Sequence, residues 1–155
     1  MLKRWLALAA VVIVLDQWSK SAIVGHFTYG ETLAVNSVFG LVLAHNEGAA
    51  FSMLDDAGGW QRWFFTAIAV AASAWIVVLL RKHAANPLFC FALTMILGGA
   101  LGNLIDRIQL GYVVDFLLFH WDGHYFPAFN LADSAITLGA GLLLWDSFKQ
   151  SKEKA

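Results

Sequence analysis

Four aspartates lie within or beside strongly apolar segments of this sequence: Asp16, Asp106, Asp115 and Asp133. An ionised side chain at membrane depth costs roughly 3 kcal/mol on insertion scales, so each of these acids needs a partner or a function. Asp16 has a candidate partner in Lys20, one helical turn later, and we interpret this pair as structural first, with substrate contact second. Asp106 can pair or cap locally, which leaves Arg107 free to hold a carbonyl or carboxylate with its planar guanidinium.

Asp115 and Asp133 have no basic neighbour in the sequence. Two carboxylates in one poorly solvated site cannot both ionise easily, so they would share a proton and titrate as a coupled pair. Such a pair can perform the chemistry of an aspartic protease, in which one acid activates water and the other polarises the scissile carbonyl. The same acids could instead line an ion or proton path, and the residues alone leave both interpretations open.

Two other constellations are weaker. Ser19 beside Lys20 has the residue types of a serine–lysine peptidase, but neighbours on a helix point about 100° apart. His120 and His124 have the i, i+4 spacing of a helical metal site. Gly123 lies between them and disfavours a helix, so we expect no metal there.

The elements that position these residues are predicted to be membrane helices. The 155 residues are 59% hydrophobic and only 14% charged, whereas about a quarter is usual in soluble proteins. We expect an all-α integral membrane protein whose single domain covers residues 1–155, with no nucleic-acid partner. Its four spans are expected at approximately residues 5–24, 60–80, 88–106 and 131–148, with outer loops at 25–59 and 107–130.

Basic residues predict the orientation of these spans. Of the ten Lys and Arg residues, seven fall at the chain ends or in the turn between the second and third spans, at positions 3, 4, 81, 82, 149, 152 and 154. By the positive-inside rule both termini are cytoplasmic and both long loops face outward. Lys3 and Arg4 before an apolar run also fit a cleavable signal peptide, but Asp16 and Lys20 follow that run, as do three further spans.

The first outer loop has the pattern of a small sheet. Residues 32–35 and 38–44 are rich in β-branched and large apolar side chains around Asn36-Ser37, as in a hairpin. A turn is predicted at residues 46–48, and residues 49–54 could form one or two turns of a short periplasmic helix.

Five motifs occur in order along the whole chain, at residues 16–20, 46–51, 98–107, 114–116 and 129–133. Together they resemble the lipoprotein signal peptidase family, also called signal peptidase II. The resemblance implies four transmembrane helices with an extracytoplasmic sheet cradle, and a catalytic dyad of Asp115 and Asp133. It implies that five further residues line the site: Asn46, Gly48, Asn103, Arg107 and Asn130. Asp16, Lys20 and Asp106 are expected to support the site.

The implied substrate is a prolipoprotein whose cysteine already carries a diacylglyceryl group, cut on the amino side of that cysteine, with no metal or organic cofactor. Each asparagine could instead only satisfy backbone groups at a helix end. The main alternative to an enzyme, a small transporter, predicts a polar route across the bilayer, yet residues 67–80 and 88–95 are almost wholly apolar. We therefore expect a monomeric enzyme of the bacterial inner membrane, in contact with membrane lipid, with its site near the outer face.

Overall fold

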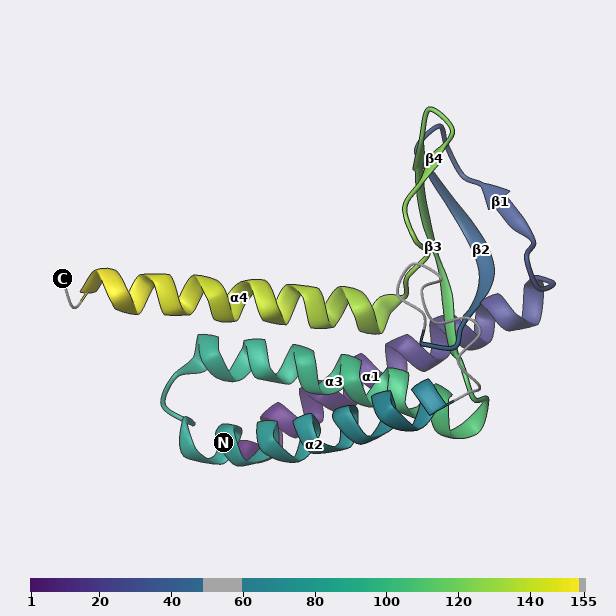
Figure 1. The fold of residues 1–155 in the computed structure, drawn as a ribbon. Coiled ribbons are helices and arrows are strands. Elements are labelled where there is room, and N and C mark those ends of the chain that lie inside the picture. Colours follow the sequence, from purple (N-terminus) through teal and green to yellow (C-terminus); the bar gives the residue numbers. More distant parts are fainter. Residues whose placement is uncertain (49–59, 154–155) are drawn as a thin grey trace.

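Four long helices and one small sheet make up the described part of the chain. The computed structural model describes residues 1–48 and 60–153, so the helical turns predicted at 49–54 lie outside the described residues. The helices are α1 (Leu2–His26), α2 (Trp60–Lys82), α3 (Pro87–Gln109) and α4 (Leu131–Glu153). The sheet stands at one end of the helices, and both chain termini lie at the other end (Figure 1). The basic residues at both chain ends and in the α2–α3 turn are therefore remote from the sheet.

The described helices include three that are long and apolar enough to cross a membrane, namely α1, α2 and α3. Each extends a few residues beyond the predicted span at one or both ends. The fourth predicted span coincides with the first part of α4, which is 23 residues long. Asp133 and Asp146 lower the hydropathy of this helix, so its passage through the membrane remains a prediction.

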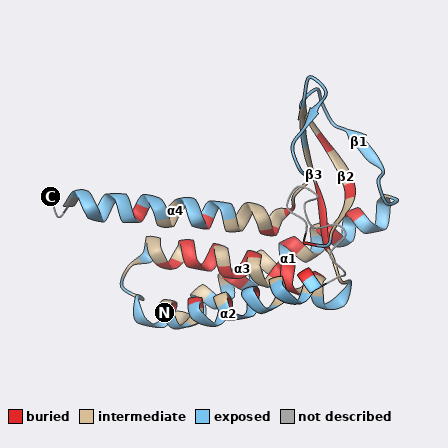
Figure 2. Cartoon of the chain, in the orientation of Figure 1, coloured by how far each residue is buried: buried red, intermediate tan, exposed pale blue. Residues whose placement is uncertain are grey.

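α3 occupies the centre of the helical layer, because it contacts α1, α2 and α4. Its first turn has two features that favour a helix start: proline stands at the first helical position, and the Asn86 side chain accepts a hydrogen bond from the Phe89 N–H at 3.1 Å. Buried residues gather on α3, whereas the outward sides of the other helices are exposed (Figure 2). Those exposed sides carry large apolar residues such as Val14, Trp75 and Leu144, as expected of surfaces that face lipid.

The sheet consists of four antiparallel strands in the order β1-β2-β3-β4. They are β1 (Thr32–Ala34), β2 (Phe39–Asn46), β3 (Val113–Trp121) and β4 (His124–Tyr125). The predicted hairpin is confirmed, and its turn is held by the Asn36 side chain, which accepts from the Val38 and Phe39 N–H groups at 2.9 Å. β3 pairs with β2 and was not predicted as a strand.

The β3–β4 hairpin shows how His120 and His124 lie relative to each other. Its two turn residues, Asp122 and Gly123, have positive φ of 49° and 77°, as in a two-residue hairpin turn. His120 pairs with Tyr125 across the hairpin, and His124 pairs with Trp121. Because side chains alternate between faces along a strand, the two histidines point to opposite faces, and the helical metal spacing does not occur.

Two apolar clusters join these parts. One lies among α1, α2 and α3 and consists of Ala9, Ile76, Leu80, Cys90, Leu93 and Leu97. The other fixes the sheet on the end of α1 and consists of Ile23, Leu43, Val114 and Phe116. Since Asp115 lies between two residues of the second cluster, its backbone is held firmly against the helical layer.

Candidate active site

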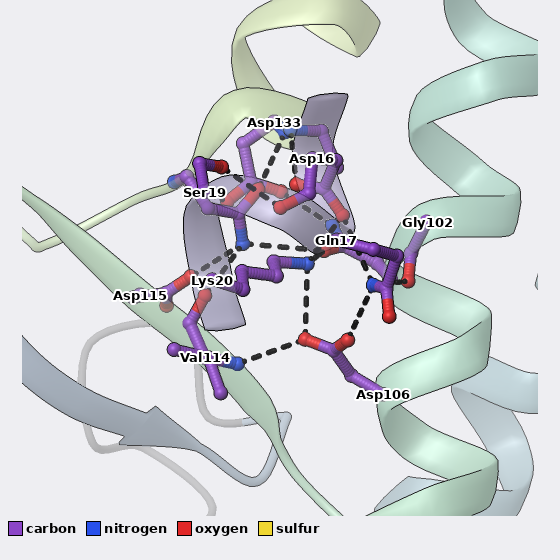
Figure 3. A network of polar contacts seen from close by, with 12 residues as sticks. Asp16, Gln17, Ser19, Lys20, Gly102, Asp106, Val114, Asp115 and Asp133 are labelled. Atoms are coloured by element: carbon purple, nitrogen blue, oxygen red, sulfur yellow. Dashed lines mark hydrogen bonds and ion pairs between the residues drawn. The ribbon is translucent and has the colours of Figure 1, made fainter. Parts of the chain in front are cut away.

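The predicted site residues meet where the helical layer joins the sheet. The polar ends of α1 and α3, the start of β3 and the first turn of α4 contribute side chains to one network (Figure 3). Six of these side chains are buried: Asp16, Lys20, Asn103, Asp106, Asp115 and Asn130. Buried polar groups are stable only when they are paired, so their partners define the site.

Lys20 is the centre of this network. Its ammonium lies 2.8 Å from Asp16 Oδ2 and 2.9 Å from Asp106 Oδ2, and it donates to Asn103 Oδ1 at 2.9 Å. The predicted Asp16–Lys20 pair is thus confirmed. With both carboxylates in salt bridges to it, Lys20 is not placed to serve Ser19, whose hydroxyl donates to the Asp16 carbonyl at 2.8 Å.

Among the described residues, the Asp106 side chain has no local partner of the kind that the sequence predicts. Besides Lys20, it accepts hydrogen bonds from the Gln17 side chain at 2.7 Å and from the Val114 backbone N–H at 3.1 Å. The prediction of local pairing was wrong because a helix end in a folded chain can reach residues that are distant in sequence. Asp106 instead ties α3 to α1 and to β3.

Asp133 is held at the first turn of α4 by three hydrogen bonds. Its Oδ1 accepts from Asn103 Nδ2 at 2.7 Å, and its Oδ2 accepts from the Asn130 backbone N–H at 3.2 Å. Its own backbone N–H donates to Asn130 Oδ1 at 2.9 Å. Asn130 and Asp133 thus form a reciprocal cap at the N-terminus of α4.

The Asp115 carboxyl group accepts hydrogen bonds from two side-chain amides. Asn130 Nδ2 donates to its Oδ1 at 2.7 Å, and Asn46 Nδ2 donates to its Oδ2 at 3.0 Å. The residue is 3% exposed. Burial, and secondly the charge of Asp133, raise the pKa of the Asp115 carboxyl to about 7, although both amides oppose the shift. Asp115 therefore retains a proton at pH values where an ordinary aspartate is ionised.

Gly48 fixes the amide of Asn46. The Gly48 N–H donates to Asn46 Oδ1 at 2.9 Å, so the Asn46 Nδ2 group is turned towards Asp115. Gly48 has φ of 105°, and a Cβ atom there would lie 2.8 Å from the Phe65 ring. Only glycine fits this position without strain. The motif residues that follow, 49–51, lie outside the described residues.

Arg107 lies half-buried beside the acids. Its guanidinium is 5.5 Å from the centre of the Phe65 ring, and Nη1 makes a long hydrogen bond of 3.5 Å to the Asn103 carbonyl. Within the part of the chain that the structure describes, its buried Nε has no hydrogen-bond partner. Arg107 therefore has donors available for a further acceptor, as its sequence position suggests.

An open apolar cavity of about 490 Å³ adjoins Asp133. Its lining comes from the segment before α4 and from one side of that helix: Phe126, Phe129, Asp133, Ser134, Thr137 and Leu138. A chain or ligand with apolar groups can thus approach the Asp133 carboxylate along α4.

Glycines allow the close contacts that bring the acids together. A Cβ atom at Gly102 would lie 2.6 Å from Asp16 Oδ2, and one at Gly99 would collide with the Ala132 carbonyl. Asp16 in turn accepts a hydrogen bond from the Ala132 N–H at 2.9 Å. The start of α4 therefore sits directly on α1 and α3.

Gln17 is a site residue for which no role was predicted. Its amide donates to Asp106 Oδ1 at 2.7 Å and to the Gly102 carbonyl at 3.2 Å. Its position in the sequence could have indicated this role, because Gln17 is a polar residue next to Asp16 in a mostly apolar helix.

Comparison with known proteins gives consistent results. The sequence model of the Peptidase_A8 family, described as signal peptidase (SPase) II, matches residues 8–149. A lipoprotein signal peptidase of Ralstonia nicotianae is 56% identical over 146 residues, which cover 94% of this chain and 84% of the relative. A lipoprotein signal peptidase of a Janthinobacterium species is 53% identical over 146 residues, with coverage of 94% and 88%.

Solved structures show the same arrangement. One, a bacterial membrane enzyme determined by the in meso method at 2.3 Å resolution, superposes with a TM-score of 0.87 at 31% sequence identity. That superposition covers 99% of this chain and 92% of the other.

Proposed function

The chain belongs to the signal peptidase II family of bacterial membrane peptidases, and from this premise we propose that it is an aspartic endopeptidase. Its family removes signal peptides from prolipoproteins. We propose further that the substrates are diacylglyceryl-modified, that cleavage occurs on the amino side of the lipidated cysteine, and that Asp115 and Asp133 are the catalytic pair.

One observation carries the proposal of an aspartic mechanism: a single residue, Asn130, binds both acids. Its side chain donates to Asp115 at 2.7 Å, and its backbone N–H donates to Asp133 at 3.2 Å. The two carboxyls are thereby held close to each other beside an open cavity, and the charge of Asp133 raises the pKa of Asp115. This is the coupling that a shared proton requires.

The proposed reaction needs one proton on the pair. The ionised carboxylate takes a proton from water as the water oxygen bonds to the scissile carbonyl carbon, and the protonated carboxyl donates to the carbonyl oxygen. The tetrahedral intermediate then returns a proton to that second acid as the C–N bond breaks. The departing amine of the cysteine receives the proton that the first acid took from water.

Arg107 is the proposed holder of substrate carbonyls. Its Nε is buried and unpartnered among the described residues, and the guanidinium interacts electrostatically with Asp133, Asp106 and Asp115. A fixed cation beside the pair can orient a peptide and stabilise the developing negative charge on its oxygen. Asn46, Asn103 and Asn130 act in this proposal mainly by orienting the acids.

The proposed location is the bacterial inner membrane, with four spans, both termini in the cytoplasm and the site near the outer face. The charge distribution supports it, because the described basic residues at positions 3, 4, 81, 82, 149 and 152 lie at the end of the helices remote from the sheet. A lipid anchor in the outer leaflet would hold the scissile bond at the depth of the pair. One chain supplies both acids, so we propose a monomer.

The test is cleavage of a diacylglyceryl-modified prolipoprotein by the purified, detergent-solubilised protein. Asp115→Asn and Asp133→Asn should each abolish cleavage. Each has a matched control: Asp122→Asn in the exposed turn after β3, and Asp146→Asn at the far end of α4. Both controls, and Ser19→Ala, should cleave at close to the wild-type rate in the presence of a chelator.

The contrary outcomes separate the alternatives. Cleavage by both folded Asn variants at Asp115 and Asp133 would show that the pair is not catalytic. Loss of activity with chelator would point to a metal. A folded wild-type protein that never cleaves the substrate would favour the transporter interpretation.

A further inference from the structure

The orientation of one amide connects Lys20 to Asp133. Asn103 Oδ1 accepts from Lys20 Nζ at 2.9 Å, and Asn103 Nδ2 donates to Asp133 Oδ1 at 2.7 Å. An ammonium has only donors, so the amide must present its oxygen to Lys20 and its NH₂ group to Asp133. Asn130 Nδ2 donates to the same Asn103 oxygen at the longer distance of 3.2 Å. Lys20 is thus the charged and closer of the two donors that make Asp133 face an NH₂ group and not a carbonyl.

Lys20 is able to hold that orientation because its ammonium is fixed in place. The residue is 3% exposed, and its ammonium lies between the carboxylates of Asp16 and Asp106. Its third donor position is the one that Asn103 uses.

The two members of the catalytic pair lie in different surroundings. Asp133 stands in the first turn of α4, where it accepts the Asn130 backbone N–H and where the helix dipole favours a negative charge. Asp115 stands on β3 and not within a helix, it accepts no backbone N–H of α4 among the described contacts, and its two donors are the neutral amides of Asn46 and Asn130. The surroundings therefore favour the negative charge on Asp133.

We propose that Lys20, acting through the side-chain amide of Asn103, holds Asp133 as the ionised member of the pair and so leaves the shared proton on Asp115. This inference rests on the proposed function. It makes Asp133 the base that activates water and Asp115 the acid that polarises the scissile carbonyl. Lys20 is a positioning residue in this scheme, because it touches neither acid of the pair directly.

Other charges face the pair and must be considered. They are Asp16 and Lys20 on α1, and Asp106 and Arg107 on α3. Asp16 and Lys20 offset each other at 2.8 Å, so replacing both by neutral residues leaves the net charge of the site unchanged. A change in the pair's titration in such a variant reports the lost Lys20–Asn103 contact and not a change in net charge.

The experiment is the pH profile of kcat/KM for prolipoprotein cleavage. Lys20→Met alone would leave two buried carboxylates unpaired and endanger folding, so the main variants are the double variant Lys20→Met with Asp16→Asn, and Asn103→Leu. Arg62→Met is the control, because Arg62 donates to the Ile108 carbonyl and not to the network. Folding is checked by the thermal unfolding midpoint of each purified variant.

We expect the acid limb of the profile, where Asp133 must lose its proton, to move to higher pH by about one unit in both main variants. Combining all three substitutions should move it no further, because both changes break the same contact. The Arg62→Met profile should not move.

Acid limbs that stay in place in the folded variants would overturn the proposal, since a merely structural role lowers the rate without moving the profile. Shifts that add in the combined variant would also overturn it, because Lys20 would then act independently of Asn103. Failure of the proposed function itself has a different signature, namely cleavage by Asp115→Asn or Asp133→Asn.

Discussion

Asn130 and Asp133 cap each other at the start of α4: the Asn130 N–H donates to Asp133 Oδ2 at 3.2 Å, and the Asp133 N–H donates to Asn130 Oδ1 at 2.9 Å. The same Asn130 side chain also donates to Asp115. The contact that begins the helix is therefore also the contact that places one acid beside the other.

Asn130→Ala should reduce both stability and activity. Loss of the cap should cost about 1 kcal/mol, and loss of the donor to Asp115 should lower cleavage by more than that destabilisation explains. Asn86→Ala is the matched control, because Asn86 caps α3 at the opposite end. It should lower the unfolding midpoint to a similar degree and leave kcat/KM unchanged; equal losses of activity in both variants would contradict a special role for Asn130.

Activity should fall as the pH rises through about 7, because burial and the charge of Asp133 raise the pKa of Asp115 to about 7 and the reaction needs its proton. The hydrogen bond from Asn46 lowers that pKa. Asn46→Ala removes the bond, so its alkaline limb should lie at higher pH than that of the wild type. Asn36→Ala, in the exposed β1–β2 turn, should not move the limb. An Asn46→Ala limb at lower pH would show that the assigned direction is wrong.

Gly102→Ala should be strongly destabilising. Its methyl group would lie 2.6 Å from Asp16 Oδ2 and would displace a carboxylate that binds both Lys20 and the Ala132 N–H. Overpacking of this kind costs about 1–3 kcal/mol. Gly141→Ala on α4 meets nothing within 4 Å and should be neutral or slightly stabilising. Thermal unfolding in detergent compares the two, and an equally stable Gly102→Ala protein would contradict the close contact.

Arg107→Lys should impair catalysis more than folding. Lysine keeps the positive charge but lacks the planar set of donors, so kcat/KM should fall about tenfold or more while the unfolding midpoint changes little. Arg62→Lys is the control, since Arg62 also lies against an aromatic ring, that of Trp63, but donates to the Ile108 carbonyl. Activity of Arg107→Lys equal to that of this control would remove Arg107 from the proposed site.

Local patterns in the sequence predicted local structure well. The helices at the four predicted segments, the β1–β2 hairpin and the Asp16–Lys20 pair each depend on residues close together in the chain, and all are present. The convergence of Asp115, Asp133 and their asparagines was expected from the family resemblance. Residue types and spacing alone left an ion path open, because they do not specify which helices meet.

Contacts between distant segments were not predictable in the same way. β3 reads as an almost continuous apolar run without polar alternation, and its strand form depends on pairing with β2, about 70 residues earlier in the chain, with Asn46 opposite Val113. The Asp106 carboxylate likewise binds Lys20 and the Val114 N–H, partners that only the packing of α1, α3 and β3 brings to it.

α4 is the last helix of the described chain, and it carries Asp133 in its first turn. When the ribosome has synthesised the chain as far as β3, Lys20, Asn103 and Asp115 are already present. The second acid, Asp133, has not yet been made. The proposed pair comes into existence only when the final helix packs against α3. If the proposed pair is catalytic, a partly inserted chain that lacks Asp133 cannot yet hydrolyse peptides in the membrane around it.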